Sequence, residues 1–307
     1  MDTDNDLPVV RFRLNMDRIL GVIKLSFSDV SVLRGIEPFQ TDGVRADILR
    51  TTVVFLHATF EDFLRTIARQ RIAIVKSQEV LDKIPLVGVS KSGRAEKFYL
   101  GALNAHRGKT VDQLIRESVE NYLDETSFAS IRAIDEVLRQ AGLDTAPFKF
   151  LYADIDQMVQ RRHRIVHEAD LPSPKDAVAG PWTIEDYFSL CIWLLVVPTF
   201  YSQLRLSIDP ADEVQRWYVA SRIKAIEFAR EARAETIALL NQPHPEVEAL
   251  RLGLLKASER LKELLALLAR PSAEEMFLIW KKAKSSDDDT TDEQARAKII
   301  SWRDTGQ

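Results

Sequence analysis

Residues that break helices are scarce in this chain, and this scarcity is the strongest constraint on its fold. Only 11 glycines and 12 prolines are spread over 307 residues. Glycine and proline are the residues that most disfavour a helix interior, so the long segments without them can form long helices. Apolar side chains recur in these segments at helical spacing, and no convincing run alternates as a strand would. The sequence therefore predicts an all-α fold, in which a helical bundle is followed by additional C-terminal helices.

The chain is expected to consist of a helical domain and a C-terminal helical region. Residues 1–9 are expected to be a flexible N-terminus, 10–207 a helical bundle, and 208–307 a region richer in Ala, Leu, Glu, Arg and Lys. The acidic run near 285–293 predicts a linker. The expected helices span 10–33, 45–75, 111–123, 127–141, 148–168, 184–206, 211–240, 245–268 and 273–282. Gly142 is expected to end the helix over 127–141, and Thr183, with Asp186 three residues on, is expected to cap the start of the helix over 184–206.

Charge and composition exclude several classes of protein. The chain has 42 Lys and Arg against 46 Asp and Glu, a net charge of −4, which argues against a protein that coats nucleic acid with positive charge and leaves room for a local basic cleft. Its single cysteine, Cys191, cannot form an internal disulfide or a cysteine zinc site. The longest apolar stretch, Leu190 to Val197, is shorter than the roughly 20 residues that a membrane helix needs. The N-terminus does not resemble a signal peptide, so we expect a cytoplasmic protein without membrane contact.

The residues best suited to catalysis or ligand binding lie together near the end of the helix predicted over 148–168. They form the run Arg161-Arg162-His163-Arg164-Ile165-Val166-His167-Glu168. An apolar stripe at helical spacing is expected to contain Leu151, Ile155, Met158 or Val159, and Val166. Arg162 falls on this stripe, and a guanidinium on an apolar face needs a partner or a cleft because desolvating it is costly.

Three interpretations of this run follow from its residues. His163 and His167 are four residues apart and share a helix face beside Arg162. Arginine binds phosphate with a rigid fork of donors and histidine transfers protons near neutral pH, so the set suits phosphate chemistry. The simpler alternative is a solvated helix end, where positive charge interacts favourably with the helix dipole. The third interpretation is a metal ion bound by both histidines. No obvious third ligand accompanies the two histidines in the sequence.

The arrangement Arg162-x4-His167, with the polar His163 directly after the arginine, resembles the signature of the HEPN superfamily (higher eukaryotes and prokaryotes nucleotide-binding). The string from Arg161 to Asp170 looks most like its RiboL-PSP-HEPN branch. Residues 56–65 resemble the second-helix segment of these domains, and residues 126–144 resemble the helix that precedes the signature helix. The resemblance covers roughly residues 10–207 and implies a HEPN-like helical bundle.

The resemblance implies a metal-independent endoribonuclease that needs no cofactor. Such enzymes cleave RNA through the 2′-hydroxyl, leave a 2′,3′-cyclic phosphate, and build a composite site in a homodimer. Carried over by position, Arg162 would orient and neutralise the scissile phosphate, His167 would act on the 2′-hydroxyl or the leaving oxygen, and His163 would support the site. The resemblance also implies a toxin or antiphage defence effector, with an antitoxin or defence-system protein as a candidate partner.

Two other functions are compatible with the same residues. The first is a non-catalytic HEPN-like module that binds RNA, nucleotide or a protein. The second is a metallohydrolase, which a chelator would inactivate.

Further candidates lie outside this run. Glu61 is an acid in an otherwise apolar helix and is expected to support the site by holding Arg162 or a site histidine, with a structural ion pair as the simpler alternative. Lys91, Arg94 and Lys97 lie among glycines and aromatic residues, a mixture that can grip an RNA backbone and stack a base. A solvated surface loop is the simpler explanation of these three residues.

Overall fold

The structure is a computed structural model in which two compact units of the chain are distinguished. It describes residues 7–27, 43–75, 77–87, 100–171, 182–208, 210–211 and 213–242, with further helical residues at 249, 252–257, 259–261 and 263. The first unit contains residues 1–17 and 57–152, and the second contains residues 18–56 and 153–307.

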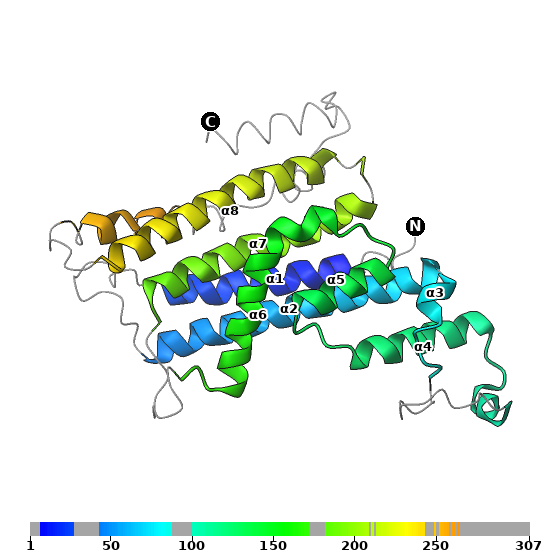
Figure 1. The fold of residues 1–307 in the computed structure, drawn as a ribbon. Helices are drawn as coiled ribbons and strands as arrows, with labels where there is room; N and C mark the ends of the chain where they lie inside the picture. The colour runs from blue at the N-terminus through cyan, green and yellow to red at the C-terminus, as the bar shows by residue number, and fades with distance from the viewer. Residues whose placement is uncertain are drawn as a thin grey trace, which may run out of the picture. The chain divides into compact units, whose positions relative to one another are not determined.

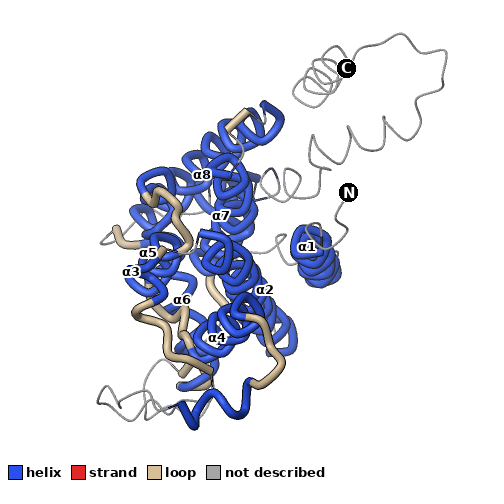
Figure 2. The backbone as a smooth tube through the Cα atoms, turned by 90° about the vertical axis from the view of Figure 1, so that its right-hand side faces the viewer, coloured by secondary structure: helices blue, strands red, loops and turns tan. Residues whose placement is uncertain are grey.

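The described residues form helices joined by loops, with no strand among them (Figure 2), so the all-α prediction is confirmed. The α-helices are α1 (Leu7–Phe27), α2 (Gly43–Val75), α3 (Gln78–Leu81), α4 (Val111–Glu125), α5 (Ile131–Gln140), α6 (Tyr152–His167), α7 (Ile184–Ile208) and α8 (Glu213–Leu240). Two 3₁₀ helices, η2 (Leu100–His106) and η3 (Ala146–Leu151), complete the described set. The expected helix over 148–168 is thus divided into the end of η3 and α6, and the first helix begins at Leu7 instead of Val10.

Local sequence signals explain how α4 and α5 of the first unit begin and end. Thr110 and Gln113 form a reciprocal capping box at the start of α4, and the Ser130 hydroxyl accepts a hydrogen bond from the backbone N–H of Ala133 in α5. Gly142 follows α5 with a φ of 71°, and the N–H of Leu143 then bonds the carbonyl of Leu138 at 3.0 Å. The prediction that Gly142 ends this helix is confirmed, since glycine adopts the left-handed region without strain.

In the second unit α7 lies beside α8 (Figure 1). Nearly all of α7 is apolar, and 16 of its 25 residues are buried. By length and composition it is the one helix of the described residues that passes for a membrane span, but 83% of its most apolar window is buried inside the protein. Burial among other helices is what the core helix of a soluble protein shows, and it accounts for the apolar sequence.

Cys191 lies in the middle of this buried helix, and its environment gives a first testable prediction. Burial raises the pKa of the Cys191 thiol to about 12, so the reactive thiolate is scarce at neutral pH. We expect native protein to leave a chromogenic disulfide reagent unreacted, and protein unfolded in guanidinium to react with one equivalent. Rapid reaction of the native protein would show that α7 is not packed as described.

Candidate functional site

The last turns of α6 extend beyond the hydrophobic core that covers its beginning. Ile155, Met158 and Val159 are buried as the apolar stripe predicted. Val166 is 46% exposed, so its expected place in the buried stripe is wrong. Arg162 is only partly buried, and its guanidinium makes no ion pair with any residue that the structure describes. The apolar stripe continues to Val166, but the side chains that cover the earlier part of the stripe do not extend that far along the helix.

His163 and His167 form a close, tilted pair of rings on the exposed side of this helix end. Their ring centroids are 4.6 Å apart, and the ring planes are tilted by 42°. The side chain of His163 is 60% exposed, and its Nε2 atom lies 3.9 Å from Oε1 of Glu168. Their i, i+4 spacing thus brings both imidazoles to one solvent-facing surface, on the same two turns of α6 as Arg162.

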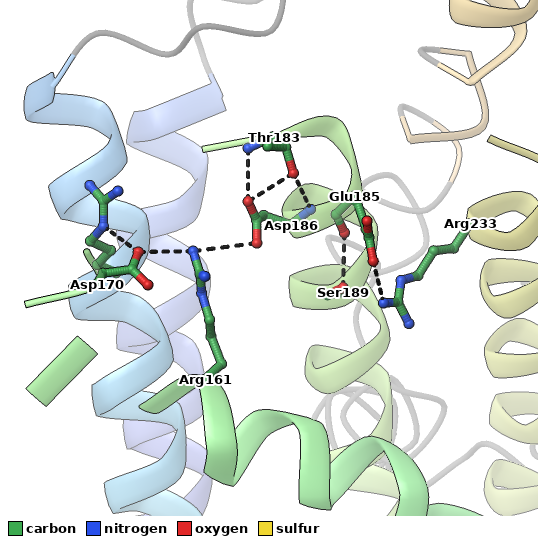
Figure 3. A network of polar contacts seen from close by, with 8 residues as sticks. Arg161, Asp170, Thr183, Glu185, Asp186, Ser189 and Arg233 are labelled. Atoms are coloured by element: carbon green, nitrogen blue, oxygen red, sulfur yellow. Dashed lines mark hydrogen bonds and ion pairs between the residues drawn. The ribbon is translucent and has the colours of Figure 1, made fainter. Parts of the chain in front are cut away.

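Arg161 has a different environment from its neighbour Arg162. Its side chain is only 11% exposed and reaches between two carboxylates, as Figure 3 shows. One terminal nitrogen lies 2.9 Å from Oδ2 of Asp170 and 3.4 Å from Oδ1 of Asp186. The guanidinium carbon also lies 5.3 Å from the ring centroid of Trp182, a cation–π distance. Arg161 is therefore committed to internal contacts, whereas Arg162 makes no ion pair within the described part of the chain.

Asp170 is the buried acid on which two arginines converge. Its side chain is 4% exposed, and Oδ2 accepts hydrogen bonds from Arg161 of α6 and from Nε of Arg50 of α2 at 2.7 Å. A carboxylate in such a place needs these charged donors, because an unpaired buried charge is strongly destabilising.

Asp186 connects Arg161 to the start of α7. The backbone N–H and the hydroxyl of Thr183 both donate to Oδ2 of Asp186 at 2.8 Å, and the N–H of Asp186 donates to the Thr183 hydroxyl at 3.2 Å. The prediction that Thr183 caps this helix, with Asp186 three residues on, is confirmed. The reciprocal cap leaves Oδ1 of Asp186 facing Arg161 (Figure 3).

The backbone that follows α6 is in an unusual conformation. Ala169 and Asp170 have φ values of 51° and 55°, in the left-handed region that non-glycine residues rarely adopt. This conformation costs about 1–2 kcal/mol per residue. It lets the N–H groups of Glu168 and Asp170 both donate to the carbonyl of Arg164, at 2.9 and 3.1 Å. Such strain persists only where the surroundings hold it, and the buried Asp170 side chain supplies that hold.

Helix α8 braces α6 and α7 through two arginines. Arg230 donates from Nε to Oδ2 of the buried Asp154 at 3.2 Å, with a second bond from its terminal nitrogen to the same oxygen. Arg233 donates to the side chain of Gln157 at 3.0 Å and to Glu185 at 2.7 Å. The first two turns of α6 are thus tied to a helix that lies later in the chain.

The other candidates from the sequence lie elsewhere. Glu61 belongs to the first unit, where its carboxylate accepts a hydrogen bond from Arg65 at 2.9 Å and lies 3.9 Å from Nδ1 of His57. Its supporting role stays a prediction. Lys91, Arg94 and Lys97 lie outside the described residues. In the part of the chain that is described, no three His, Cys, Asp or Glu side chains are grouped as metal ligands would be.

Sequence reasoning missed the network around Arg161. Arg161 precedes the expected site arginine and carries no mark that separates it from Arg162 or Arg164. Asp170 lies 120 residues from Arg50, and no local pattern predicts a pair at that separation. The one available signal was Asp186, whose capping position at the start of α7 is readable from its spacing to Thr183.

Fold and site together define an all-α protein with a partly buried arginine and an exposed pair of histidines at the end of one helix. The family model described as RiboL-PSP-HEPN matches residues 24–195, more than half of the chain, and the match includes this helix. The chain belongs to this family, a HEPN-type domain. It belongs accordingly to a superfamily of ribonuclease-like and nucleotide-binding proteins. Among curated proteins and among solved structures, no match to the chain was found.

Proposed function

We propose that the protein is a metal-independent endoribonuclease of the HEPN type, with its active site at the exposed end of α6. The observation that carries the proposal is that the signature residues share two turns of one helix: the imidazoles of His163 and His167 are close together and exposed, and Arg162 has no carboxylate partner among the described residues. An arginine neutralised by an acid would bind phosphate poorly, and no acid of the described residues competes for Arg162 in this way.

The proposed reaction needs only groups that this helix supplies and the RNA itself. The 2′-hydroxyl loses its proton to a histidine, and its oxygen bonds to the adjacent phosphorus. The bond from phosphorus to the 5′-oxygen breaks, and that oxygen takes up a proton to become a 5′-hydroxyl. His167 acts on the 2′-hydroxyl or on the leaving oxygen, His163 supports it, and Arg162 stabilises the charge on the phosphate oxygens.

The reaction needs one group that accepts a proton, one that donates a proton, and a site shielded from water. Two copies of the chain provide these more easily than one copy. The exposure of His163 and of the apolar Val166 supports a partner surface at this end of α6. In the proposed homodimer each copy contributes one Arg162 and one His167 to a composite site. Contact between the copies would exclude water and strengthen every charge interaction with the phosphate.

The same exposure favours a second candidate, a non-catalytic module that binds RNA, nucleotide or a protein. An exposed set of cationic and aromatic side chains suffices for binding phosphate and a base. For this candidate the Arg162→Ala and His167→Ala variants weaken binding of labelled RNA, and neither they nor the native protein cleave it.

The proposed biological setting is that of a cytoplasmic toxin or antiphage defence effector. An enzyme that cuts cellular RNA needs restraint, and an antitoxin or another defence-system protein is the partner class that would supply it. Co-expression with neighbouring genes, followed by measurement of cell growth and RNA integrity, tests this setting separately from the chemistry.

Cleavage of mixed RNA in the presence of a chelator tests the proposed activity. We expect native protein to cut RNA, including tRNA, in EDTA and to leave 2′,3′-cyclic phosphate ends, which mass spectrometry detects. Arg162→Ala should reduce kcat/KM by about 10²-fold or more, because one preorganised donor to a developing anion contributes that much in comparable sites. Lys224→Ala, in an exposed position on α8, is the matched control and should leave cleavage unchanged.

Two outcomes contradict the proposal. Activity that vanishes with the chelator and returns with a metal ion favours a metallohydrolase. Folded, dimeric protein that binds RNA and leaves it intact favours the binding module.

A further inference from the structure

The end of α6 is held from its inner side by residues that do not reach the exposed histidines. Asp170 receives Arg50 of α2 and Arg161 of α6, and Arg161 also faces Asp186 at the start of α7. Arg50, Arg161, Asp170 and Asp186 all belong to the second compact unit. A buried carboxylate three residues after His167 thus joins α2 to α6, and Arg161 extends the contact to α7.

We propose that Asp170, held by Arg50 and Arg161, is a positioning residue that sets the direction of the last turn of α6 and so places His167 and Arg162 on the RNA. The inference rests on the function proposed above and adds residues to it. It assigns the two adjacent arginines different tasks: Arg161 anchors the helix, and Arg162 binds the phosphate.

The backbone geometry supports this role. Two consecutive non-glycine residues, Ala169 and Asp170, are held in the left-handed region directly after the helix. In that conformation the N–H groups of Glu168 and Asp170 close onto the Arg164 carbonyl and complete the last turn. Alanine has no intrinsic preference for this conformation and aspartate only tolerates it, so without the ion pairs the turn that carries His167 would open.

The electrostatic geometry also supports it. Oδ2 of Asp170 takes a donor from each arginine, at 2.7 Å from Arg50 and 2.9 Å from Arg161. Arg161 lies over the face of Trp182, and its side chain is only 11% exposed. Neither charge is exposed to substrate, so a change at Asp170 acts on the reaction only through the position of α6.

Replacement of Asp170 by asparagine separates positioning from folding. Asparagine has almost the same shape and tolerates the left-handed conformation, but it lacks the charge that holds both arginines. We expect Asp170→Asn to reduce kcat by about tenfold or more with KM little changed, because a catalytic group displaced by about 1 Å can lose 10²-fold in rate. Asp156→Asn is the matched control: it removes a carboxylate from the same helix, where it bonds only the exposed Gln160 among described residues, and should leave kcat unchanged.

A second measurement does not depend on cleavage. Amide hydrogen exchange of Glu168 and Asp170 reports the closure of the last turn directly. We expect both amides to exchange faster in Asp170→Asn than in the native protein and the Asp156→Asn control. Arg161→Lys is a second variant, in case Asp170→Asn does not fold, and should open the same turn. The double variant should show no more loss than the larger single loss, since both act through one contact.

The outcomes separate the two proposals. If native protein does not cleave RNA but Asp170→Asn exchanges faster at these amides, the proposed function fails and the anchoring contact stands. Unchanged exchange in Asp170→Asn overturns the positioning role whether or not RNA is cleaved. Faster exchange with unchanged kcat also overturns it, because the last turn would then open without effect on the reaction.

Discussion

Substitution of His167 by alanine is expected to reduce RNA cleavage by about 10²- to 10⁴-fold, the usual contribution of a positioned general acid or base. His167 is the last residue of α6 and is exposed, and its ring centroid lies 4.6 Å from that of His163. Because it fills no part of the core, its removal should leave the melting temperature nearly unchanged. The loss should appear in kcat, measured with a labelled oligoribonucleotide at saturating concentration.

Two controls make this prediction sharp. His106→Ala removes a histidine from η2, where its Nε2 atom lies 3.2 Å from the Val87 carbonyl, and should retain cleavage. His163→Ala removes the supporting ring and should lose less activity than His167→Ala. If His167→Ala keeps native activity while Arg162→Ala loses it, His167 takes no part in the reaction. This surface would then contribute only phosphate binding.

Deletion of residues 209–307 is expected to prevent stable folding, although the family match ends at residue 195. The deletion removes α8, whose Val219 and Ile226 are buried, and each such side chain contributes about 1.5–3 kcal/mol of burial. It also removes Arg230 from the buried Asp154, leaving that carboxylate without its arginine. These losses are comparable with the 5–15 kcal/mol that typically separates folded from unfolded protein.

The shortened chain and the full chain should be compared by soluble fraction, thermal melting and binding of a hydrophobic dye. A point variant isolates the ion pair: Arg230→Ala should lower the free energy of unfolding by about 1–3 kcal/mol, because a buried acceptor loses its charged donor. Lys224→Ala changes an exposed cation of the same helix and should have almost no effect. A shortened chain that melts cooperatively and cleaves RNA would instead make the C-terminal region an independent appendage.

Much of the local structure could be read from the sequence because its causes are local. Thr183 with Asp186 three residues on, and Gly142 after an apolar helix, are satisfied by the backbone of their own turns. The buried face of α6 follows from the spacing of Ile155, Met158 and Val159. Periodicity indicates which side of a helix is apolar, but it does not indicate how far along the helix the covering side chains extend. Val166 was misplaced for that reason.

The sequence by itself determined the helical class, the family to which the chain belongs, and the short run of residues in which the chemistry lies. Only the tertiary structure decided how the arginines of that run differ: Arg161 turns inward to Asp170 and Asp186, and Arg162 makes no ion pair with a described residue. The physical reason is separation along the chain. Asp170 joins Arg161 to Arg50, and Arg50 lies 120 residues before Asp170 in the chain. This contact depends on the packing of three helices, and no pattern within one helix encodes it.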